Sequence, residues 1–143
     1  MEQQEKHVLN AFYKNAAVGL DATCSILEKA AQPELREELC KQLRYYQNQK
    51  DSVRKQMQEN CIQPQEQGEL AKLCANLSIR MRCAGGVSSG EIAKLMLKGT
   101  NMGVIQLTEV LHRSPEISDS LKRQGKEIVH HEEAYMERLK AYL

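Results

Sequence analysis

Two short motifs carry the residue types that bind transition metals in helical proteins. Glu109-Val-Leu-His112 and Glu127-Ile-Val-His130 each place a glutamate three residues before a histidine. In di-iron bundles, two helices each contribute such a Glu-x-x-His pair, and two further helices each add an inward glutamate. The motifs therefore raise the hypothesis of a ferritin-like protein that binds iron or manganese through carboxylate and histidine ligands.

The expected packing places the two motifs apart. If their helices run antiparallel about a turn near Pro115, His112 lies near one end of the bundle and His130 lies nearer its middle. At a rise of ~1.5 Å per residue, they are separated by roughly 15–25 Å along the axis. The first helix also offers no inward glutamate, and the second offers glutamine. We therefore expect Glu and His on exposed helix faces and keep the metal site as an alternative.

The last predicted helix carries a dense group of ionisable residues between positions 127 and 133. Within this group, Glu132 falls at a seam spacing where an apolar residue is expected. We expect it at the edge of the bundle in water; a polar core with His131 or Lys98 nearby is the alternative. An unpaired buried carboxylate would need a partner or a raised pKa. A metal pocket, the third possibility, would use Glu127, His130, His131 and Glu132.

Two glycines lie in the interior of the strongest helical segment, which spans residues 88–112 and has a further glycine in its first turn. An interior glycine costs roughly 1 kcal/mol relative to alanine, so Gly99 and Gly103 need a structural reason. They are four residues apart and share one face. We expect a notch at the centre of the bundle that faces the middle of the last helix. A small-ligand pocket at this notch would use Gly99, Asn101, Gly103 and Glu132.

Hydrophobic spacing predicts an all-α protein. Apolar residues recur at intervals of three and four, as on the buried face of a helix, and no β-hairpin signal is present. Ser88 followed by Glu91 forms a capping box, and Pro33 suits a first helical turn. We predict one domain over residues 1–143, an up-down antiparallel bundle of four to five helices. The helical segments span residues 3–31, 33–59, 65–84, 88–112 and 118–143.

The second predicted helix has glutamine at three of its seam positions, which are Gln42, Gln49 and Gln56. This line faces either solvent or another subunit. Nearby, the Tyr46 ring is expected to fill the space above Gly19, which lies on the first helix.

Composition excludes several function classes. The formal net charge is +1, so we expect no nucleic-acid partner. The N-terminus lacks an apolar signal segment, and no apolar run approaches the ~18–20 residues that span a bilayer. With an odd count of five cysteines, we expect reduced thiols, a cytoplasmic location and no membrane partner. Phosphate-binding loops, Rossmann glycines, serine elbows and zinc-type cysteine pairs are absent. We therefore predict no catalytic residue and no cofactor.

Three segments resemble one known family. They are FYKNAAVGLDA (12–22), GEIAKLMLKGTNMGVIQLTEVL (90–111) and EAYMERLKAYL (133–143), and the sharpest motif is KGTNMG at 98–103. They resemble a family of small, uncharacterised all-helical bacterial proteins from Firmicutes that are often described as ferritin-like. The resemblance implies a ferritin-like bundle but assigns no activity. Relatives often read His-Ile-Ala-Glu where this chain reads EIAK (91–94), so no role follows for that segment.

The first hypothesis for function is a non-enzymatic helical bundle that acts through self-association, as a homo-oligomer, or through a protein partner. Tight small-residue positions without a catalytic motif favour this role. The iron- or manganese-binding protein and the small-ligand binder near the glycine notch are the alternatives.

Overall fold

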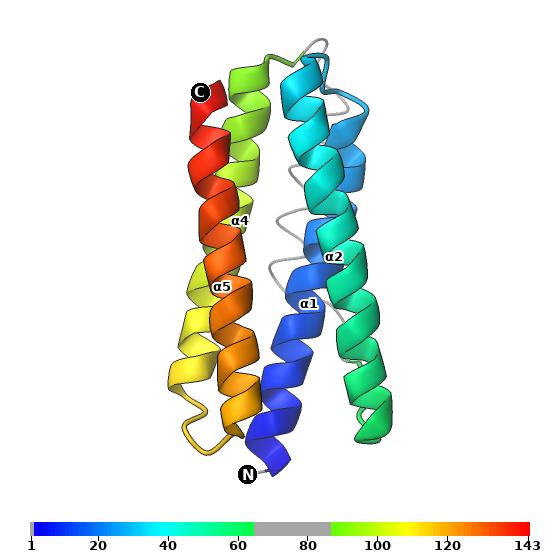
Figure 1. Cartoon of the computed structure of the whole chain (residues 1–143), viewed down its shortest axis with the longest axis vertical. Helices are drawn as coiled ribbons and strands as arrows, with labels where there is room; N and C mark the ends of the chain where they lie inside the picture. The colour runs from blue at the N-terminus through cyan, green and yellow to red at the C-terminus, as the bar shows by residue number, and fades with distance from the viewer. Residues whose placement is uncertain (1, 65–86) are drawn as a thin grey trace.

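The protein is an all-α helical bundle, as the sequence predicts. A computed structural model describes residues 2–64 and 87–143, and no strand occurs in these two ranges. The long helices pack side by side along their lengths (Figure 1). The predicted helix over residues 65–84 lies outside the described residues. The elements are α1 (Glu2–Leu27), α2 (Pro33–Glu59), α4 (Ser89–His112), α5 (Asp119–Leu139) and the short 3₁₀ helix η1 (Lys140–Tyr142).

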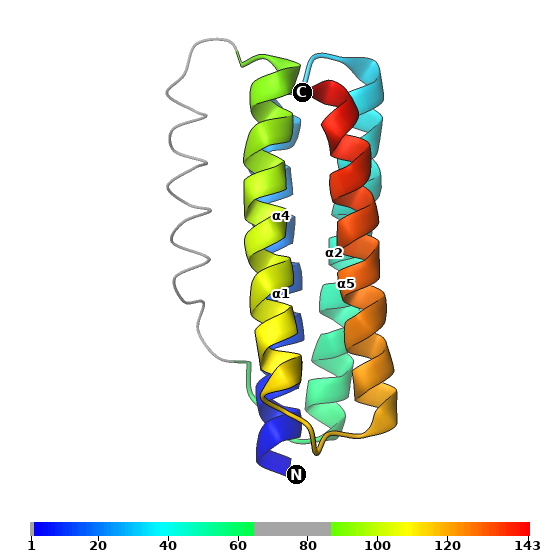
Figure 2. The same cartoon turned by 90° about the vertical axis from the view of Figure 1, so that its left-hand side faces the viewer.

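The helices form two antiparallel pairs. α1 packs against α2 and α4 packs against α5, and α1 also contacts α4. Figures 1 and 2 show that α1 and α5 run in one direction and that α2 and α4 run in the other. The α2 helix ends near the N-terminal end of the bundle, whereas α4 begins at the opposite end. α2 and α5 therefore lie side by side and antiparallel on the face shown in Figure 1.

Local sequence signals account for most helix ends. The Ser88 side chain accepts a hydrogen bond from the Glu91 backbone N–H at 3.2 Å, which confirms the start of the predicted capping box. The α1 helix ends at Leu27, four residues before its predicted end. Gln32 is extended ahead of Pro33, as the residue before a proline tends to be. The Arg36 guanidinium then donates to Leu27 O, the last carbonyl of α1, at 3.0 Å and to Ala30 O in the following turn at 3.3 Å.

The core consists of two apolar clusters with a polar layer between them. The polar layer contains Asn15, Gln42, Tyr46 and Glu132, each near the middle of its helix. The clusters occupy opposite ends of the bundle; one includes Val8, Phe12, Met57, Leu107 and Ile128, and the other includes Ile26, Leu39, Ile92, Met96 and Leu139. The polar layer is thus enclosed by apolar side chains above and below.

The glycine notch differs from its prediction. Gly103 is buried, but a Cβ atom there would lie 2.5 Å from Oδ1 of Asn15 on α1, so Gly103 faces α1 rather than α5. Gly99 is only partly buried and has no described atom within 4 Å of a Cβ position. The buried face of α4 passes through Met96, Thr100 and Gly103, so Gly99 lies at its edge. Of the two glycines, only Gly103 makes room for a described side chain.

The close approach predicted at Gly19 is confirmed. A Cβ atom at Gly19 would lie 2.5–2.7 Å from three atoms of the Tyr46 ring, closer than van der Waals contact permits. The hydroxyl end of the Tyr46 ring therefore occupies the space that a side chain at Gly19 would need.

We predict that Gly19→Ala destabilises the protein. Overpacking costs about 1–3 kcal/mol, and it should outweigh the ~1 kcal/mol gain in helix propensity because the Tyr46 hydroxyl is held by Glu132. Chemical denaturation measures the free energy of unfolding. Gly90→Ala is the matched control, since a Cβ there lies 3.6 Å from its nearest neighbour, and it should be neutral or stabilising. A stabilised Gly19→Ala protein would contradict this packing.

Candidate functional site

The polar layer is organised around Glu132, which is only 1% exposed. The expectation that it lies in water at the edge of the bundle is therefore wrong. The buried positions of α5 are Leu121, Gly125, Ile128, Glu132, Tyr135 and Leu139. These positions follow the spacing of a single helical face, so the apolar residues on both sides carry Glu132 into the core.

Uncharged donors from two other helices surround the Glu132 carboxylate. Oε2 accepts hydrogen bonds from the Tyr46 hydroxyl at 2.9 Å and from Nε2 of Gln42 at 3.3 Å. Oε1 accepts a weaker bond from Nδ2 of Asn15 at 3.4 Å. The three bonds join α1 and α2 to α5 at one buried group.

No cationic side chain of the described residues forms an ion pair with this carboxylate. Neither of the two residues that were predicted to lie beside the Glu132 carboxylate contacts it. Lys98 is exposed on α4, and His131 contacts the carboxylate's partner Gln42 rather than the carboxylate itself. The layer is the predicted polar core, but it is built from amides and a phenol.

Burial raises the pKa of Glu132 to about 7, because the apolar surroundings disfavour the charged carboxylate. The hydrogen bonds from Tyr46 and Asn15 act in the opposite direction, since they stabilise the charged form. Desolvation is the larger effect. Glu132 therefore exchanges its proton close to neutral pH, where an exposed glutamate is fully ionised.

Gln42 connects the buried carboxylate to a histidine nearer the surface. Its amide nitrogen donates to Glu132, which leaves its oxygen to accept from Nε2 of His131 at 3.2 Å. The His131 ring also stacks on Tyr45, with 3.4 Å between ring centroids and 15° between planes. Burial lowers the pKa of His131, and the positive charge of Arg138 acts in the same direction. His131 is therefore neutral at physiological pH, with its Nε2 hydrogen directed at Gln42.

Three tyrosines near Glu132 have raised pKa values. Burial raises the pKa of Tyr45, Tyr46 and Tyr135, and the negative charge of Glu132 raises each of them further. All three phenols therefore stay protonated at neutral pH. The Tyr135 hydroxyl is buried and has no hydrogen-bond partner among the described residues. The polar layer therefore has a negative electrostatic potential when Glu132 is ionised. It also contains one buried hydroxyl, that of Tyr135, without a hydrogen-bond partner among the described residues.

The predicted metal ligands do not converge. Glu127 and His130 are exposed, as are Glu109 and His112, whereas Glu132 points into the core. Glu109 is ion-paired with Arg113 at 3.4 Å. Across the part of the chain that the structure describes, no group of three or more His, Cys, Asp or Glu side chains gathers as a metal site would require.

The predicted small-ligand pocket is only partly assembled. Asn101 is exposed and Gly99 lies at the edge of the buried face, but Asn15 joins Gly103 to Glu132 by contacting both. A hollow of about 240 Å³ between α1 and α4 has Asn15 and Gly103 among its walls. The notch therefore adjoins the polar layer through Asn15, a residue the sequence analysis did not select.

The predicted glutamine line of α2 faces α5 within the same chain. Gln42 is buried, and Gln56 forms a reciprocal amide pair with Gln124, with bonds of 3.0 and 2.8 Å. Glu38 forms an ion pair with Arg138 across the same helices. We call this contact the α2–α5 seam. It is held by polar side chains from Glu38 to Gln56, so two of the predicted glutamines are already engaged.

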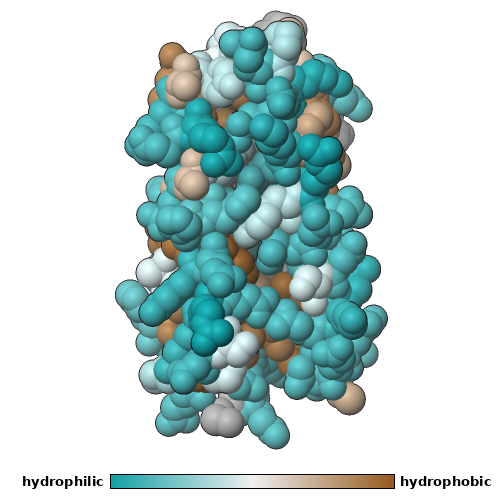
Figure 3. Space-filling view, viewed as in Figure 1, coloured by the Kyte–Doolittle hydropathy of each residue, from teal (hydrophilic) through white to brown (hydrophobic). Residues whose placement is uncertain are grey.

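A groove of about 450 Å³ runs along the α2–α5 seam. In Figure 3, which shows this face, the surface is mostly hydrophilic, with hydrophobic side chains visible near its middle. The Tyr45–His131 stack lies at one end of the groove and the Gln56–Gln124 pair at the other. Between them, the walls are Gln49, Ser52, Glu127 and Ile128.

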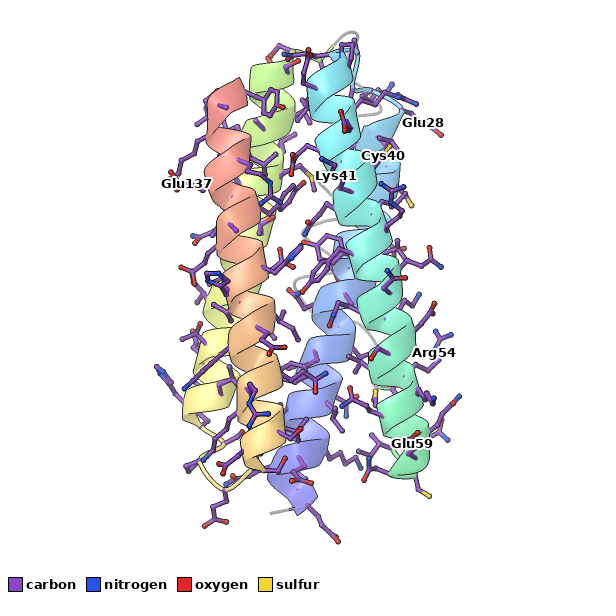
Figure 4. The ribbon with its side chains drawn as sticks, viewed as in Figure 1. Glu28, Cys40, Lys41, Arg54, Glu59 and Glu137 are labelled. Carbon is purple, nitrogen blue, oxygen red and sulfur yellow. The ribbon has the colours of Figure 1, made fainter. Side chains whose placement is uncertain are left out.

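Other reactive or charged groups lie outside this site. Cys24 and Cys61 are exposed free thiols, and Cys40 is a partly buried free thiol on α2. Figure 4 shows Cys40 on α2 and Glu137 on α5, where Glu137 points away from the bundle. Cys74 and Cys83 lie outside the described residues.

Sequence reasoning missed the roles of Asn15, Gln42 and Tyr46. The available signal was a polar residue at the middle of an apolar face, which Gln42, Tyr46 and Glu132 all share. The pattern could place each residue on its helix face. It could not align the three helices along the bundle axis, so the meeting of these side chains was not predicted.

No protein-family model, curated protein or solved structure matches this chain. The resemblance to a ferritin-like bacterial family therefore stays a prediction. No helix within residues 2–64 and 87–143 has the length and apolar character needed to cross a membrane. The cytoplasmic location also stays a prediction.

We predict that Glu132→Gln removes a pH dependence of stability. The folded pKa of about 7 lies above the unfolded value near 4.5, so the wild type loses stability as pH rises through this window. The loss is about 3 kcal/mol once Glu132 is ionised in both states. The free energy of unfolding of the variant, relative to the wild type, should rise by that amount between pH 4.5 and 8.

Denaturation at a series of pH values measures this difference, and the exposed neighbour Glu133 supplies the control. Glu133→Gln should track the wild type at every pH. If the free energies of unfolding of Glu132→Gln and the wild type changed in parallel with pH, the pKa of Glu132 would be the same in the folded and unfolded protein.

We predict that Tyr46→Phe raises the pKa of Glu132 further above 7. The lost hydroxyl bond favours the ionised carboxylate, so its removal makes ionisation harder. A carbon-detected NMR titration of the Glu132 carboxyl group measures the change. Tyr13→Phe is the control, because among the described residues the Tyr13 hydroxyl bonds only the exposed Arg54, and it should leave the Glu132 titration in place. An unchanged or lower pKa in Tyr46→Phe would contradict the geometry.

Proposed function

We propose that this protein acts by binding rather than by catalysis, and that protonation of Glu132 controls its conformation. The protonated bundle is closed, and ionisation of Glu132 loosens the α2–α5 seam. The loosened helices then associate with a second copy of the chain or with another protein. This proposal extends the role predicted from the sequence.

One observation carries the proposal: a carboxylate that is 1% exposed has uncharged donors as its only described hydrogen-bond partners. A buried ionised group without an opposite charge is strongly unfavourable. Glutamine at this position would fill the same volume without that penalty. Strongly perturbed ionisable groups cluster at functional sites, which favours a working role for Glu132 over a purely structural one.

The position of the group supports a conformational effect. Two of its three hydrogen bonds come from α2, through Gln42 and Tyr46. Nearer the surface, the side-chain contacts of the α2–α5 seam are polar, such as Gln56–Gln124, and apolar residues of both helices lie beneath them in the core clusters. Water can replace those polar contacts at little net cost, whereas α1 and α2 are joined by much closer backbone packing. Charging Glu132 is therefore expected to open the seam first.

Association is supported by what an opened seam would present. The α2 face carries Gln42, Gln49 and Gln56, whose amides both donate and accept hydrogen bonds. In the closed state, Gln42 and Gln56 are engaged with α5. Opening would free them for a partner helix, so binding and proton release would be linked.

We predict that amide-exchange protection of α2 and α5 falls between pH 6 and pH 8 in the wild type, relative to α1 and α4. Hydrogen exchange with mass-spectrometric detection, corrected for the intrinsic pH effect, measures this protection. Sedimentation velocity under the same conditions should show a larger species at pH 8, formed with a second copy of the chain or with an added protein partner. Glu132→Gln should be closed at both pH values. Equal protection and equal sedimentation of the two proteins at both pH values would refute the proposal.

A further inference from the structure

The Tyr135 hydroxyl is a buried hydrogen-bond donor that the described core leaves unused. The side chain is fully buried within an apolar cluster to which all four long helices contribute. Its hydroxyl has no hydrogen-bond partner among the described residues. A buried polar group without a partner costs free energy and is uncommon in folded proteins. The unpaired hydroxyl is explained most directly if it gains a partner in another state of the protein.

Glu132 is an acceptor that lies close to Tyr135 along α5. The two residues are three positions apart on the buried face of this helix, and residues at that spacing are neighbours on a helix surface. Aromatic side chains in helices lean towards the preceding turn, which for Tyr135 contains Glu132. Burial raises the pKa of Tyr135, and the negative charge of Glu132 raises it further. The hydroxyl and the carboxyl group therefore share one face and lie within electrostatic reach of each other.

The ionised carboxylate of Glu132 has room for one more donor. Its two oxygens offer about four acceptor sites, and hydrogen bonds from Tyr46, Gln42 and Asn15 occupy three of them. The protonated group accepts fewer bonds, because one oxygen carries a hydrogen. The raised pKa of Tyr135 keeps its hydroxyl protonated over the pH range in which Glu132 ionises. Loss of the Glu132 proton therefore creates an acceptor site, and Tyr135 holds a matching donor.

We propose that Tyr135 is a positioning residue for the conformational change, and that its hydroxyl donates a hydrogen bond to Glu132 when this carboxyl group is ionised. Tyr46 and Gln42 bind the carboxylate from α2, so their bonds break when α2 separates from α5. Tyr135 lies on the same helix as Glu132, so its bond does not depend on α2. The ionised carboxylate keeps a donor from its own helix while the α2–α5 seam opens. The inference rests on the proposed function only for that opening.

The charged or titratable groups around Glu132 and Tyr135 belong to α2 and α5. They are Tyr45, Tyr46 and Glu38 on α2 and His131 and Arg138 on α5. Within their described residues, α1 and α4 contribute no charged side chain to either group. Glu38 and Arg138 form an ion pair with each other, so their effects on Tyr135 are opposed. Burial lowers the pKa of His131, so this ring titrates below Glu132. Ionisation of Glu132 is therefore the change of charge that Tyr135 experiences near neutral pH.

We predict that Tyr135→Phe raises the pKa of Glu132 by at least about 1, the order expected for a lost hydrogen bond to a charged group. Carbon-detected NMR titration of the Glu132 carboxyl group in the whole chain measures this value. In the wild type, the Cζ shift of Tyr135 should change with the same midpoint. Tyr142→Phe is the matched control, because Tyr142 packs against the same apolar cluster, and it should leave the Glu132 titration in place.

The free energy of unfolding provides a second test that separates this bond from a structural effect. At pH 5 the folded protein has Glu132 protonated, so Tyr135→Phe should match or exceed the wild type because it removes an unpaired buried hydroxyl. At pH 9 the variant should be less stable than the wild type. Its folded pKa lies further above the unfolded value near 4.5, so ionisation of Glu132 costs more stability. Equal effects of the substitution at both pH values would contradict the inference.

An unchanged or lower pKa of Glu132 in Tyr135→Phe would also overturn it, because the hydroxyl would then make no bond that favours the ionised group. The proposed function fails separately. If Tyr135→Phe raises this pKa but amide-exchange protection of wild-type α2 and α5 is equal at pH 6 and pH 8, the hydrogen bond stands and opening of the seam is refuted. If protection falls at the same pH in both proteins, the opening stands and the role of Tyr135 is refuted.

Discussion

The fold buries the carboxyl group of Glu132 away from water. Much of the surrounding structure compensates for the free energy that this burial costs. Glu132 needs donors because an unbonded buried carboxylate is far more costly than an exposed one. Tyr46, Gln42 and Asn15 supply them from two helices. Two of these donors depend on glycine: the Tyr46 ring lies where a Gly19 side chain would be, and Asn15 lies against Gly103. Gly19 in α1 and Gly103 in α4 thus serve the polar layer.

The seams that join the two helix pairs have different chemistry. Where α1 meets α4, Gly103 lets Asn15 approach closely. Where α2 meets α5, the contacts are an ion pair, an amide pair and the Gln42–His131 bond. Separating apolar surfaces costs free energy, whereas polar contacts can exchange with water. Glu132 lies at the α2–α5 seam, whose outer side-chain contacts are polar.

A ferritin-like metal site and the observed polar layer require different residues in the core of the bundle. A di-metal site needs several inward carboxylates and histidines, but the described core contains a single ionisable carboxylate surrounded by neutral groups. The Glu-x-x-His pairs project outward because their spacing puts both members on the solvent side of α4 and α5. Among the described residues, the buried site offers one carboxyl group, whose raised pKa lets it exchange a proton near neutral pH.

Hydrophobic spacing and capping residues determined the helices, because these signals act within a few residues of chain. They correctly placed α2, α4 and α5 and the start of α4 at Ser88. Spacing also put Glu132 and Gln42 on seam positions, yet it could not decide whether a polar seam residue is buried. That depends on the rotation and axial alignment of neighbouring helices, which long-range packing sets. Gly99 shows the same limit, since it lies at the edge of the buried face of α4 whereas Gly103 lies inside it. The sequence alone therefore predicts the helices. The proton site, the groove and the seam that they share depend on how the helices pack.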